Sequence, residues 1–367
     1  MKLYIIAGEA SGDLIGAQLI ESLLRINPTL EIWAWGGALM EKAGAKIRKN
    51  YAELAFMGFL EVVKNLPAIL KNFNFCKKDI LEFNPDIVLF IDYPGFNLRM
   101  ARWSRQKNFK TYYYVSPQVW AWNTKRVHEI KKNIDRLFCI LPFEKDFYKK
   151  YNFNVDYVGH PLIDIIDEFK KLSIINYQLS AKKPVIAILP GSRKQEIEKM
   201  LPIMLSIVPN FPDYDFIVAA VNQQPQEMYE KILAQATVQN IKIIKNDTYN
   251  ILSQATAAIV KSGTSTLETA LFNVPEIVCY KSSNISYQIG KRVVRVPYIS
   301  LVNLVVGKKI VEELIQSNFN TETLTVTLKK VLENSEKIKQ DYEELRTALG
   351  GGGASERVAK IILDIQS

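Results

Sequence analysis

The sequence predicts an α/β protein with two halves, each folded around a parallel β-sheet. Two observations predict this class. Short apolar runs of strand length alternate with longer segments of helical periodicity along the whole chain, which is typical of βαβ units. The chain also has 367 residues, of which 48% are hydrophobic, and this length favours two domains, each with its own core.

The first half opens with the clearest strand–turn–helix unit. An apolar run at residues 3–7 ends at Gly8, and helical periodicity begins at Asp13. The run is short and meets an acid at Glu9, so it indicates a core strand rather than a signal peptide. Further apolar runs predict strands at residues 31–35, 86–91, 111–115 and 136–141, with helices mostly between them.

The second half repeats this alternation after a polar stretch. Apolar runs predict strands at residues 184–189, 214–220, 241–244, 257–261 and 276–280. We therefore expect an N-terminal domain at residues 1–167, a linker at 168–183 and a C-terminal domain at 184–345. Glycines interrupt the end of the chain, and the helix within residues 346–367 is expected to pack back on the first domain.

Composition excludes several classes of protein. No run of 18 apolar residues occurs, so no transmembrane helix is expected. Cys76, Cys139 and Cys279 are odd in number and lack a CxxC spacing, which indicates reduced thiols in a cytoplasmic protein without disulfides or a zinc site.

The net charge of +9 is concentrated in one basic zone, residues 99–150, which hold 13 Lys or Arg and 4 Asp or Glu. Such a zone fits an anionic partner, which could be nucleic acid, phospholipid or a phosphorylated substrate. A solvated face without function explains the zone equally well.

A wide apolar stripe covers residues 56–75. Apolar residues from Leu60 to Leu70 recur at helical spacing, and Pro67 is expected to end or kink the helix near Asn65. The stripe suits a membrane interface or an acyl chain, and it equally suits an ordinary helix packed on a sheet.

Two motifs in the second half suit the phosphates of a nucleotide. Residues 185–193 (VIAILPGSR) lead to a helix start, where N–H groups attract anions and Arg193 can donate two hydrogen bonds to a phosphate. Residues 257–270 (AAIVKSGTSTLETA) join a strand to a hydroxyl-rich helix start, and Glu268 lies one turn further on. Each loop alone also fits an ordinary turn or N-cap, but two in one domain favour a nucleotide diphosphate.

Asp92 is the strongest catalytic candidate in the first half. It follows the apolar run at residues 86–91, and open α/β sheets present catalytic groups at the carboxyl ends of their strands. A carboxylate there can take a proton from a substrate hydroxyl, although capping the next loop is an alternative role. Of the two histidines, His160 in a Gly-His-Pro crossover is a better site candidate than His128, which lies among charged residues.

Eight segments carry distinctive motifs in a fixed order. They are GEASGD at 8–13, AFMGF at 55–59, YVSPQVWAW at 114–122, LPFE at 141–144, VGH at 158–160, LPGSR at 189–193, SGT at 262–264 with Glu268, and YISLVN at 298–303. Together these residues resemble the lipid-A-disaccharide synthase family. The matches span nearly the whole chain, and the YVSPQVWAW run makes chance similarity remote.

The resemblance implies a GT-B fold, with two Rossmann-like doubly wound domains and a cleft between them. It implies an inverting hexosyltransferase of glycosyltransferase family 19 that acts in lipid A biosynthesis for lipopolysaccharide. Such an enzyme joins UDP-2,3-diacylglucosamine to 2,3-diacylglucosamine 1-phosphate through a β-1,6 bond and releases UDP, without a metal or other cofactor. The resemblance also implies a cytoplasmic protein held at the inner face of the inner membrane of a Gram-negative-type bacterium, and it leaves a homodimer open.

The resemblance further implies roles for individual residues. Asp92 matches the aspartate proposed as base for the acceptor hydroxyl at C6, Glu9 and Ser11 lie in the acceptor loop, and His160 is a weaker catalytic candidate. Residues that would hold the nucleotide-sugar come from the second-half loops and YISLVN: Arg193, Ser192, Ser262, Gly263, Thr264, Glu268 and Asn303. Lipid or membrane contacts would come from the apolar stripe: Phe56, Met57, Phe59, Val62, Val63 and Leu66.

One loop departs from the family pattern. Relatives often have IDAPDFN, with a second aspartate, where residues 91–97 of this chain are IDYPGFN. Gly95 therefore leaves Asp92 as the only carboxylate of the loop. This strengthens Asp92 as the base, and it removes any argument that relies on a carboxylate pair.

Three other functions fit the sequence less well. A dinucleotide oxidoreductase would show GxGxxG and an acid after the second strand, whereas residues 8–12 are GEASG and the second strand ends at Trp35 without an acid. Another GT-B UDP-sugar enzyme, such as an N-acetylglucosaminyl transferase or a 2-epimerase, leaves the apolar stripe and YVSPQVWAW unexplained. A nucleic-acid-binding module would explain the basic zone but neither PGSR nor SGT, so no nucleic-acid partner is expected.

Overall fold

The computed structural model describes residues 1–54, 66–172, 181–236, 241–283, 287–288, 291–292 and 296–365. The chain forms two compact units: unit 1 comprises Met1–Pro161 and Gly352–Ser367, and unit 2 comprises Leu162–Gly351. This division differs from the expected one, because helix α9 (Pro161–Leu172) runs into unit 2 and includes the first residues of the expected linker. The C-terminal boundary also lies later than residue 345, since helix α17 (Ser335–Ala348) belongs to unit 2.

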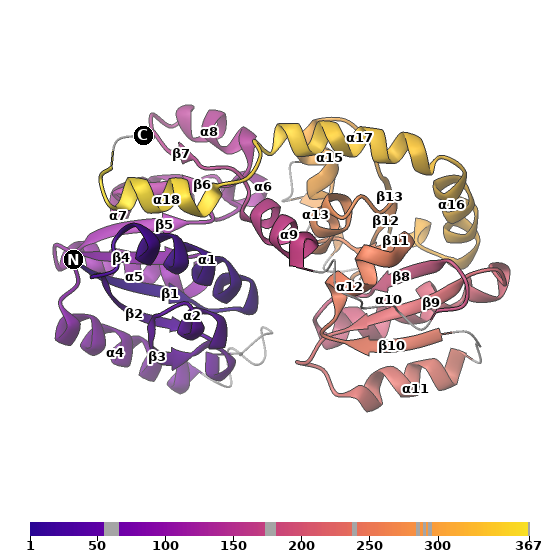
Figure 1. Cartoon of the computed structure of the whole chain (residues 1–367), viewed down its shortest axis with the longest axis horizontal. Helices are drawn as coiled ribbons and strands as arrows, with labels where there is room; N and C mark the ends of the chain where they lie inside the picture. The colour runs from indigo at the N-terminus through magenta and orange to yellow at the C-terminus, as the bar shows by residue number, and fades with distance from the viewer. Residues whose placement is uncertain are drawn as a thin grey trace. The chain divides into compact units, whose positions relative to one another are not determined.

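Unit 1 is built on a parallel seven-stranded sheet with the order β3-β2-β1-β4-β5-β6-β7 (Figure 1). Its strands are β1 (Lys2–Ala7), β2 (Glu31–Gly36), β3 (Lys46–Asn50), β4 (Ile87–Ile91), β5 (Lys110–Tyr114), β6 (Arg136–Cys139) and β7 (Asp156–Tyr157). The central strands β1 and β4 are buried almost throughout, which explains why they consist of continuous apolar runs.

Helices alternate with these strands along the chain. They are α1 (Ala10–Ile26), α2 (Ala38–Lys42), α4 (Leu66–Phe83), α5 (Pro94–Gln106), α6 (Val119–Trp122), α7 (Arg126–Asn133), α8 (Pro142–Lys149) and α18 (Ala354–Ile362), with a 3-10 turn at Tyr51–Leu54. The last helix, α18, lies beside α1 and buries Val358 and Ile362 (Figure 1). The end of the chain therefore completes the unit that its first strand begins.

Unit 2 is built on a parallel six-stranded sheet with the order β10-β9-β8-β11-β12-β13. Its strands are β8 (Val185–Leu189), β9 (Asp215–Ala220), β10 (Ile241–Lys245), β11 (Ala255–Lys261), β12 (Glu276–Tyr280) and β13 (Glu312–Ile315). Its helices, besides α9 and α17, are α10 (Lys194–Leu205), α11 (Gln226–Ala236), α12 (Thr248–Gln254), α13 (Thr264–Leu271), α15 (Leu301–Val306) and α16 (Thr321–Glu333), with 3-10 turns at Val208–Asn210 and Gln316–Asn318.

Both units are doubly wound, and the predicted fold class is confirmed. In each sheet the strand order reverses next to the first strand of the unit, between β1 and β4 in unit 1 and between β8 and β11 in unit 2. Open α/β sheets bind ligands outside the carboxyl ends of the strands at this switch point. The fold therefore marks one loop pair in each unit as the place to look for function.

The sequence did not predict the edge strands β3 and β13. Their sequences, KIRKN and EELI, are rich in charged residues, because an edge strand is only partly buried and charge there discourages pairing with other chains. All three cysteines are buried as free thiols. Among the described helices, none combines the length and hydropathy needed to cross a bilayer.

Candidate functional site

Asp92 lies at the switch point of the unit 1 sheet. The register pairs Ala7 of β1 with Ile91 of β4, so the loops that follow these strands leave the sheet next to each other. Asp92 and Tyr93 adopt left-handed backbone conformations with φ of 45° and 49°, and Val115 after β5 has φ of 67°. These angles are unfavourable for residues other than glycine, above all for a β-branched valine, and such strain clusters at functional sites.

Hydrogen bonds from neighbouring elements hold this strained turn. Tyr113 OH donates to the carbonyl oxygen of Asp92 at 2.5 Å. The amide Nδ2 of Asn97, on α5, lies 2.8 Å from the same oxygen, 3.2 Å from the carbonyl of Ile91 and 3.3 Å from that of Ile6. The ends of β1, β4 and β5 are thereby tied together, and this fixes the position of Asp92.

The Asp92 carboxyl has the electrostatic environment of a general base. Burial raises its pKa to about 6, the Glu9 carboxylate also raises it, and a hydrogen bond from the Tyr93 backbone lowers it. Asp92 is the only carboxylate of its own loop, and Glu9, from the loop after β1, is a second carboxylate whose charge acts on it. A pKa near neutrality suits a group that must accept a proton in the reaction.

The turn after β1 contributes both site and scaffold residues. A Cβ on Gly8 would lie 2.3 to 2.6 Å from atoms of the Tyr93 ring, so only glycine lets the two loops approach. Glu9 is the N-cap residue of α1, and Ser11 lies exposed in its first turn. Asp13 is buried instead, and its carboxylate accepts hydrogen bonds from the first backbone N–H groups of α2. Asp13 therefore stabilises the start of α2, whereas Glu9 and Ser11 lie where the loop after β1 meets α1.

His160 is buried next to the boundary of unit 1, and burial lowers its pKa to about 4. The imidazole is therefore neutral at physiological pH and supplies no positive charge to a phosphate. His128 lies on α7 with its ring edge-on to Tyr151, at 5.8 Å between centroids. Neither histidine lies in the loops that follow β1 and β4. No group of three or more metal-ligating side chains occurs among the described residues.

Glu144 links two of the sequence motifs, a connection the sequence did not predict. Its Oε1 accepts a hydrogen bond from Trp120 Nε1 at 3.1 Å, and its Oε2 accepts from the N–H groups of Leu141 at 3.0 Å and Ile140 at 3.2 Å. The side chain is fully buried, and burial raises its pKa to about 7. The LPFE motif therefore anchors the YVSPQVWAW segment. Only the fold brings these segments together, so no local signal could have shown the contact.

In unit 2 one carboxylate joins the two candidate phosphate loops. The register pairs Leu189 of β8 with Val260 of β11, so the PGSR and SGT loops leave the sheet next to each other. Oε1 of Glu196 lies 3.6 Å from Nη1 of Arg193 and 3.0 Å from Nζ of Lys261. Two cations, one from each loop, are thus placed beside the starts of α10 and α13.

The PGSR turn needs its glycine. Gly191 has φ of 105°, and a Cβ there would lie 2.7 Å from Oε2 of Glu196. Ser192 and Arg193 follow as exposed residues immediately before α10, where helix N–H groups point outward. The turn therefore presents backbone donors and a guanidinium at one position.

The SGT loop is hydrogen-bonded to a third segment, which contains Ile299. Ser262 Oγ donates to the carbonyl of Ile299 at 2.9 Å, and Thr266 Oγ1 donates to the carbonyl of Gly263 at 2.8 Å. Thr264 is exposed as the first residue of α13. The Ser262 hydroxyl therefore serves the fold, while Thr264 and the N–H groups of the helix start are available to a ligand.

Glu268 lies one turn into α13, and burial raises its pKa above the usual range. Its Oε1 accepts a hydrogen bond from the Tyr249 hydroxyl at 3.0 Å. The Tyr249 ring in turn packs edge-on against Phe169 and next to Phe272, with centroids 5.4 and 5.2 Å apart. The carboxyl group is therefore oriented by an aromatic cluster that the sequence did not reveal.

Asn303 has a different role from the one expected. Its side chain is fully buried, and Nδ2 donates to the carbonyl of Val311 at 3.0 Å and to Oε1 of Glu313 at 2.9 Å. Its Oδ1 accepts from the N–H groups of Ile310 at 2.8 Å and Val311 at 3.0 Å. All four hydrogen-bonding positions of the amide are occupied, so in this structure Asn303 holds residues 310–313 rather than offering a group to a ligand. Glu313 in turn accepts from the N–H groups of Ile299 and Ser300.

The apolar stripe is only partly described. Phe56, Met57, Phe59, Val62 and Val63 lie outside the described residues, as does the side chain of Leu66. The expected break near Asn65 also lies outside the described residues, and Pro67 belongs to α4, which is described from Leu66 onward. From α4, Phe73, Cys76 and Ile80 enter the core, whereas Leu70 and Phe75 are 55% and 39% exposed.

Comparison with known proteins gives a consistent result over the full length. The family model described as lipid-A-disaccharide synthetase matches residues 3–365. A lipid-A-disaccharide synthase of Geobacter sulfurreducens is 36% identical over 373 residues, covering 99% of this chain and 97% of that protein. One from Coxiella burnetii is 36% identical over 370 residues, covering 98% and 97%.

Solved structures of low sequence identity share the fold. A UDP-GlcNAc 2-epimerase from Neisseria meningitidis, bound to UDP-GlcNAc, has a TM-score of 0.70 at 14% identity and covers 99% of this chain and 100% of its own. The glycosyltransferase of kitacinnamycin has a TM-score of 0.68 at 12% identity, with coverage of 100% and 99%. These neighbours support the two-domain GT-B architecture.

Proposed function

The chain belongs to the lipid-A-disaccharide synthetase family, and from this premise we propose that it joins UDP-2,3-diacylglucosamine to 2,3-diacylglucosamine 1-phosphate through a β-1,6 bond. As a member of this family it is a glycosyltransferase of lipid A biosynthesis. The observation that carries the mechanism is the partly buried Asp92 carboxyl at the switch point of unit 1, whose pKa is raised to about 6 by desolvation.

Asp92 is the proposed general base. The acceptor oxygen at C6 attacks the anomeric carbon of the donor while Asp92 accepts the hydroxyl proton. The bond between the anomeric carbon and the phosphate oxygen breaks, and its electron pair leaves with UDP. Attack from the side opposite UDP inverts the anomeric configuration. Glu9 supports this role, because its negative charge makes Asp92 a stronger base.

Unit 2 is the proposed UDP site. Arg193, Lys261 and the N-termini of α10 and α13 supply positive charge and N–H donors for the two phosphates, where negative charge grows as UDP leaves. Ser192, Gly263 and Thr264 lie at these helix starts. Glu268 is the proposed acceptor for the ribose hydroxyls, with its other bond to Tyr249 holding it in place. Ser262 and Asn303 are proposed to stabilise the loops of this site through hydrogen bonds within the protein and not to bind UDP directly.

The acyl chains of both substrates require an apolar surface, and we propose that the segment of the apolar stripe provides it at the inner face of a membrane. Leu70 and Phe75 on α4 extend this surface into the described residues. The cytoplasmic side is proposed because both substrates and UDP would be available there.

UDP release is the experiment that tests this function. Purified protein would be given UDP-2,3-diacylglucosamine in EDTA, with and without 2,3-diacylglucosamine 1-phosphate, beside the D92A variant. We expect release that depends on the acceptor, survives EDTA and collapses in D92A. Consumption of UDP-N-acetylglucosamine instead would support another UDP-sugar enzyme of this fold and refute the lipid substrates.

A further inference from the structure

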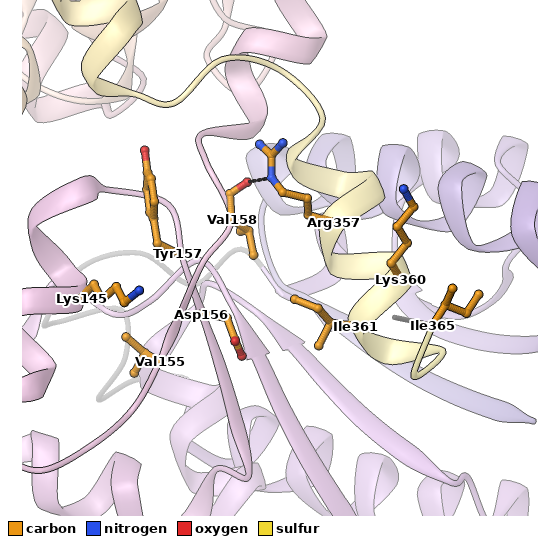
Figure 2. Close-up of a pocket in the computed structure, with 9 residues that line it drawn as sticks. All are labelled: Lys145, Val155, Asp156, Tyr157, Val158, Arg357, Lys360, Ile361 and Ile365. Carbon is orange, nitrogen blue, oxygen red and sulfur yellow. Dashed lines mark hydrogen bonds between the residues drawn. The ribbon is translucent and has the colours of Figure 1, made fainter. Parts of the chain in front are cut away.

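A pocket of about 260 Å³ lies at the outer edge of unit 1, between β7 and the last helix α18. Figure 2 shows Lys145 reaching it from α8, and Arg357 and Lys360 reaching it from α18, with β7 between them. β7 is the terminal strand of the sheet, separated from β4 by β5 and β6. Because neighbouring strands are about 4.8 Å apart, the pocket is roughly 14 Å from the strand that carries Asp92. It is therefore distinct from the catalytic candidate.

More basic than acidic side chains line this pocket: Lys145, Arg357 and Lys360 against Asp156. Arg357 donates to the carbonyls of Val158 at 2.8 Å and Gly352 at 2.9 Å, which are neutral, so the guanidinium keeps its full charge. Lys145 is exposed, and no ion-pair partner for it occurs in the described parts of the chain. Lys145 and Arg357 thus line the pocket without lying within ion-pair distance of an acid in the described parts of the chain.

Two acids at the pocket, Asp156 and Glu356, form ion pairs with other basic side chains. Asp156, the one acid in the lining, lies 3.8 Å from Nε of Arg136. Glu356, beside the pocket, lies 2.9 Å from Lys360 and 3.5 Å from Arg25. Neither acid forms an ion pair with Lys145 or Arg357, although the charge of Arg357 also acts on Glu356, and Lys360 shares Glu356 with Arg25.

The remaining lining residues are mostly apolar, which suits a phosphate ester with a carbon group better than a free inorganic ion. Val155, Val158, Ile361 and Ile365 form an apolar surface beneath the charged groups, and Tyr157 lines the pocket with its ring (Figure 2). A group that joins a phosphate to a carbon chain or sugar would contact both kinds of surface.

From this geometry we infer that the β7–α18 pocket binds the phosphate of a phosphate ester, held by Arg357, Lys145 and Lys360. A planar guanidinium fixed by two carbonyls presents its remaining N–H groups in one direction, which is the arrangement that phosphate recognition uses. The ester could be a phospholipid headgroup or a soluble phosphorylated molecule. Lys145 lies both in this pocket and in the basic zone at residues 99–150, so the proposed site gives part of that zone a role.

The test compares two double variants of the full chain. K145Q/K360Q removes two lysines of the pocket and leaves Arg357, which has a structural role, in place. K107Q/K132Q removes two exposed lysines of the basic zone that do not line the pocket. Inorganic phosphate binding is measured by calorimetry at constant ionic strength, and vesicle binding by sedimentation with phosphatidylglycerol in phosphatidylcholine.

We expect saturable phosphate binding that weakens about tenfold or more in K145Q/K360Q and stays unchanged in K107Q/K132Q. If vesicle binding weakens in the same selective way, the ester is a lipid headgroup; if vesicle binding does not change, it is soluble. Equal losses in both double variants, or no saturable phosphate binding, would overturn the inference. Sugar transfer from detergent-dispersed substrates should be unchanged in both variants, so a failure here is distinguishable from a failure of the proposed function.

Discussion

The unit 2 sheet has the same strand order as the first six strands of the unit 1 sheet, but the loops at the two switch points have opposite charge. After β1 and β4 the loops carry two carboxylates, Glu9 and Asp92, whose charges interact, on a backbone with left-handed non-glycine residues. After β8 and β11 the loops bring two cations together, Arg193 and Lys261, at helix starts that need a glycine turn.

This difference shows that the fold supplies positions and the loops supply chemistry. In unit 1, burial and strain place a carboxyl group where it can accept a proton. In unit 2, helix N-termini and cations create a site for anions at little cost in strain, because Gly191 tolerates its positive φ. If this comparison is right, substitutions in unit 1 should change the chemical step and substitutions in unit 2 should change binding.

The largest effect is expected from D92N. The amide keeps the shape of the carboxyl but cannot accept the proton, so kcat should fall about 10³-fold. Steady-state UDP release measures this. D146N, on the exposed side of α8, is the matched control and should keep full activity. A fall in kcat of less than about tenfold would remove Asp92 as the base.

A smaller loss is expected from R193A. Loss of a charge-assisted hydrogen bond to phosphate should raise the KM for the UDP-sugar about 10- to 100-fold. The matched control is K194A, which removes the same charge from the next residue, an exposed lysine paired with Glu198. Equal effects of the two variants would mean that general positive charge, and not the PGSR turn, attracts the nucleotide.

The core of unit 2 offers a test of stability. Both carboxyl oxygens of Glu276, at the start of β12, are buried without a hydrogen-bond partner in the described structure, and burial raises its pKa well above 4.5. The native state keeps this proton while the unfolded state releases it above pH 4.5. Stability is therefore lost as pH rises, by about 1.4 kcal/mol per pH unit until the native pKa is reached.

E276M should remove this slope and raise the free energy of unfolding by about 1–3 kcal/mol near neutral pH, with less gain at pH 5. Denaturant unfolding followed by far-UV circular dichroism measures it. All five tryptophans precede residue 162 and so belong to unit 1, which makes their fluorescence an internal control that the variant should not change. A gain that is independent of pH would show that Glu276 is ionised in the native state.

The smallest expected effect concerns Glu9. Activity should fall as pH drops through about 6, because Asp92 must be deprotonated to act. E9Q removes a negative charge beside Asp92, so the midpoint of the pH–rate profile for kcat/KM should move to lower pH. E21Q, exposed on α1, should leave the midpoint unchanged. An unchanged midpoint in E9Q would contradict the proposed effect of the Glu9 charge on the pKa of Asp92.

The sequence predicted those parts of the molecule that depend on local pattern. Buried strands such as β4 and β8 are continuous apolar runs because both faces are covered, whereas the charged edge strands β3 and β13 gave no such signal. Asp92 and Arg193 could be singled out because Asp92 follows β4 directly and Arg193 lies in the short turn after β8. The influence of Glu9 on Asp92 could not be predicted in this way, because it depends on strand order, which joins segments about 80 residues apart.

Long-range contacts also decided the roles of individual residues. Asn303 belongs to a motif of the family, yet its amide is fully engaged with Val311, Glu313 and Ile310. Tyr249 lies outside the residues that the sequence singled out, and Glu144 was noted only as part of the LPFE motif, yet each orients a side chain of another motif. Motif membership predicts that a residue matters, but only its contacts show whether it serves the ligand or the fold.

The dissociation constant of UDP for D92N and R193A, measured side by side by calorimetry, tests the division of labour between the units most directly. We predict that D92N binds UDP as the unaltered protein does, although its kcat is lost, and that R193A binds UDP at least about tenfold more weakly. Loss of UDP affinity in D92N, together with unchanged affinity in R193A, would contradict the assignment of chemistry to unit 1 and nucleotide binding to unit 2.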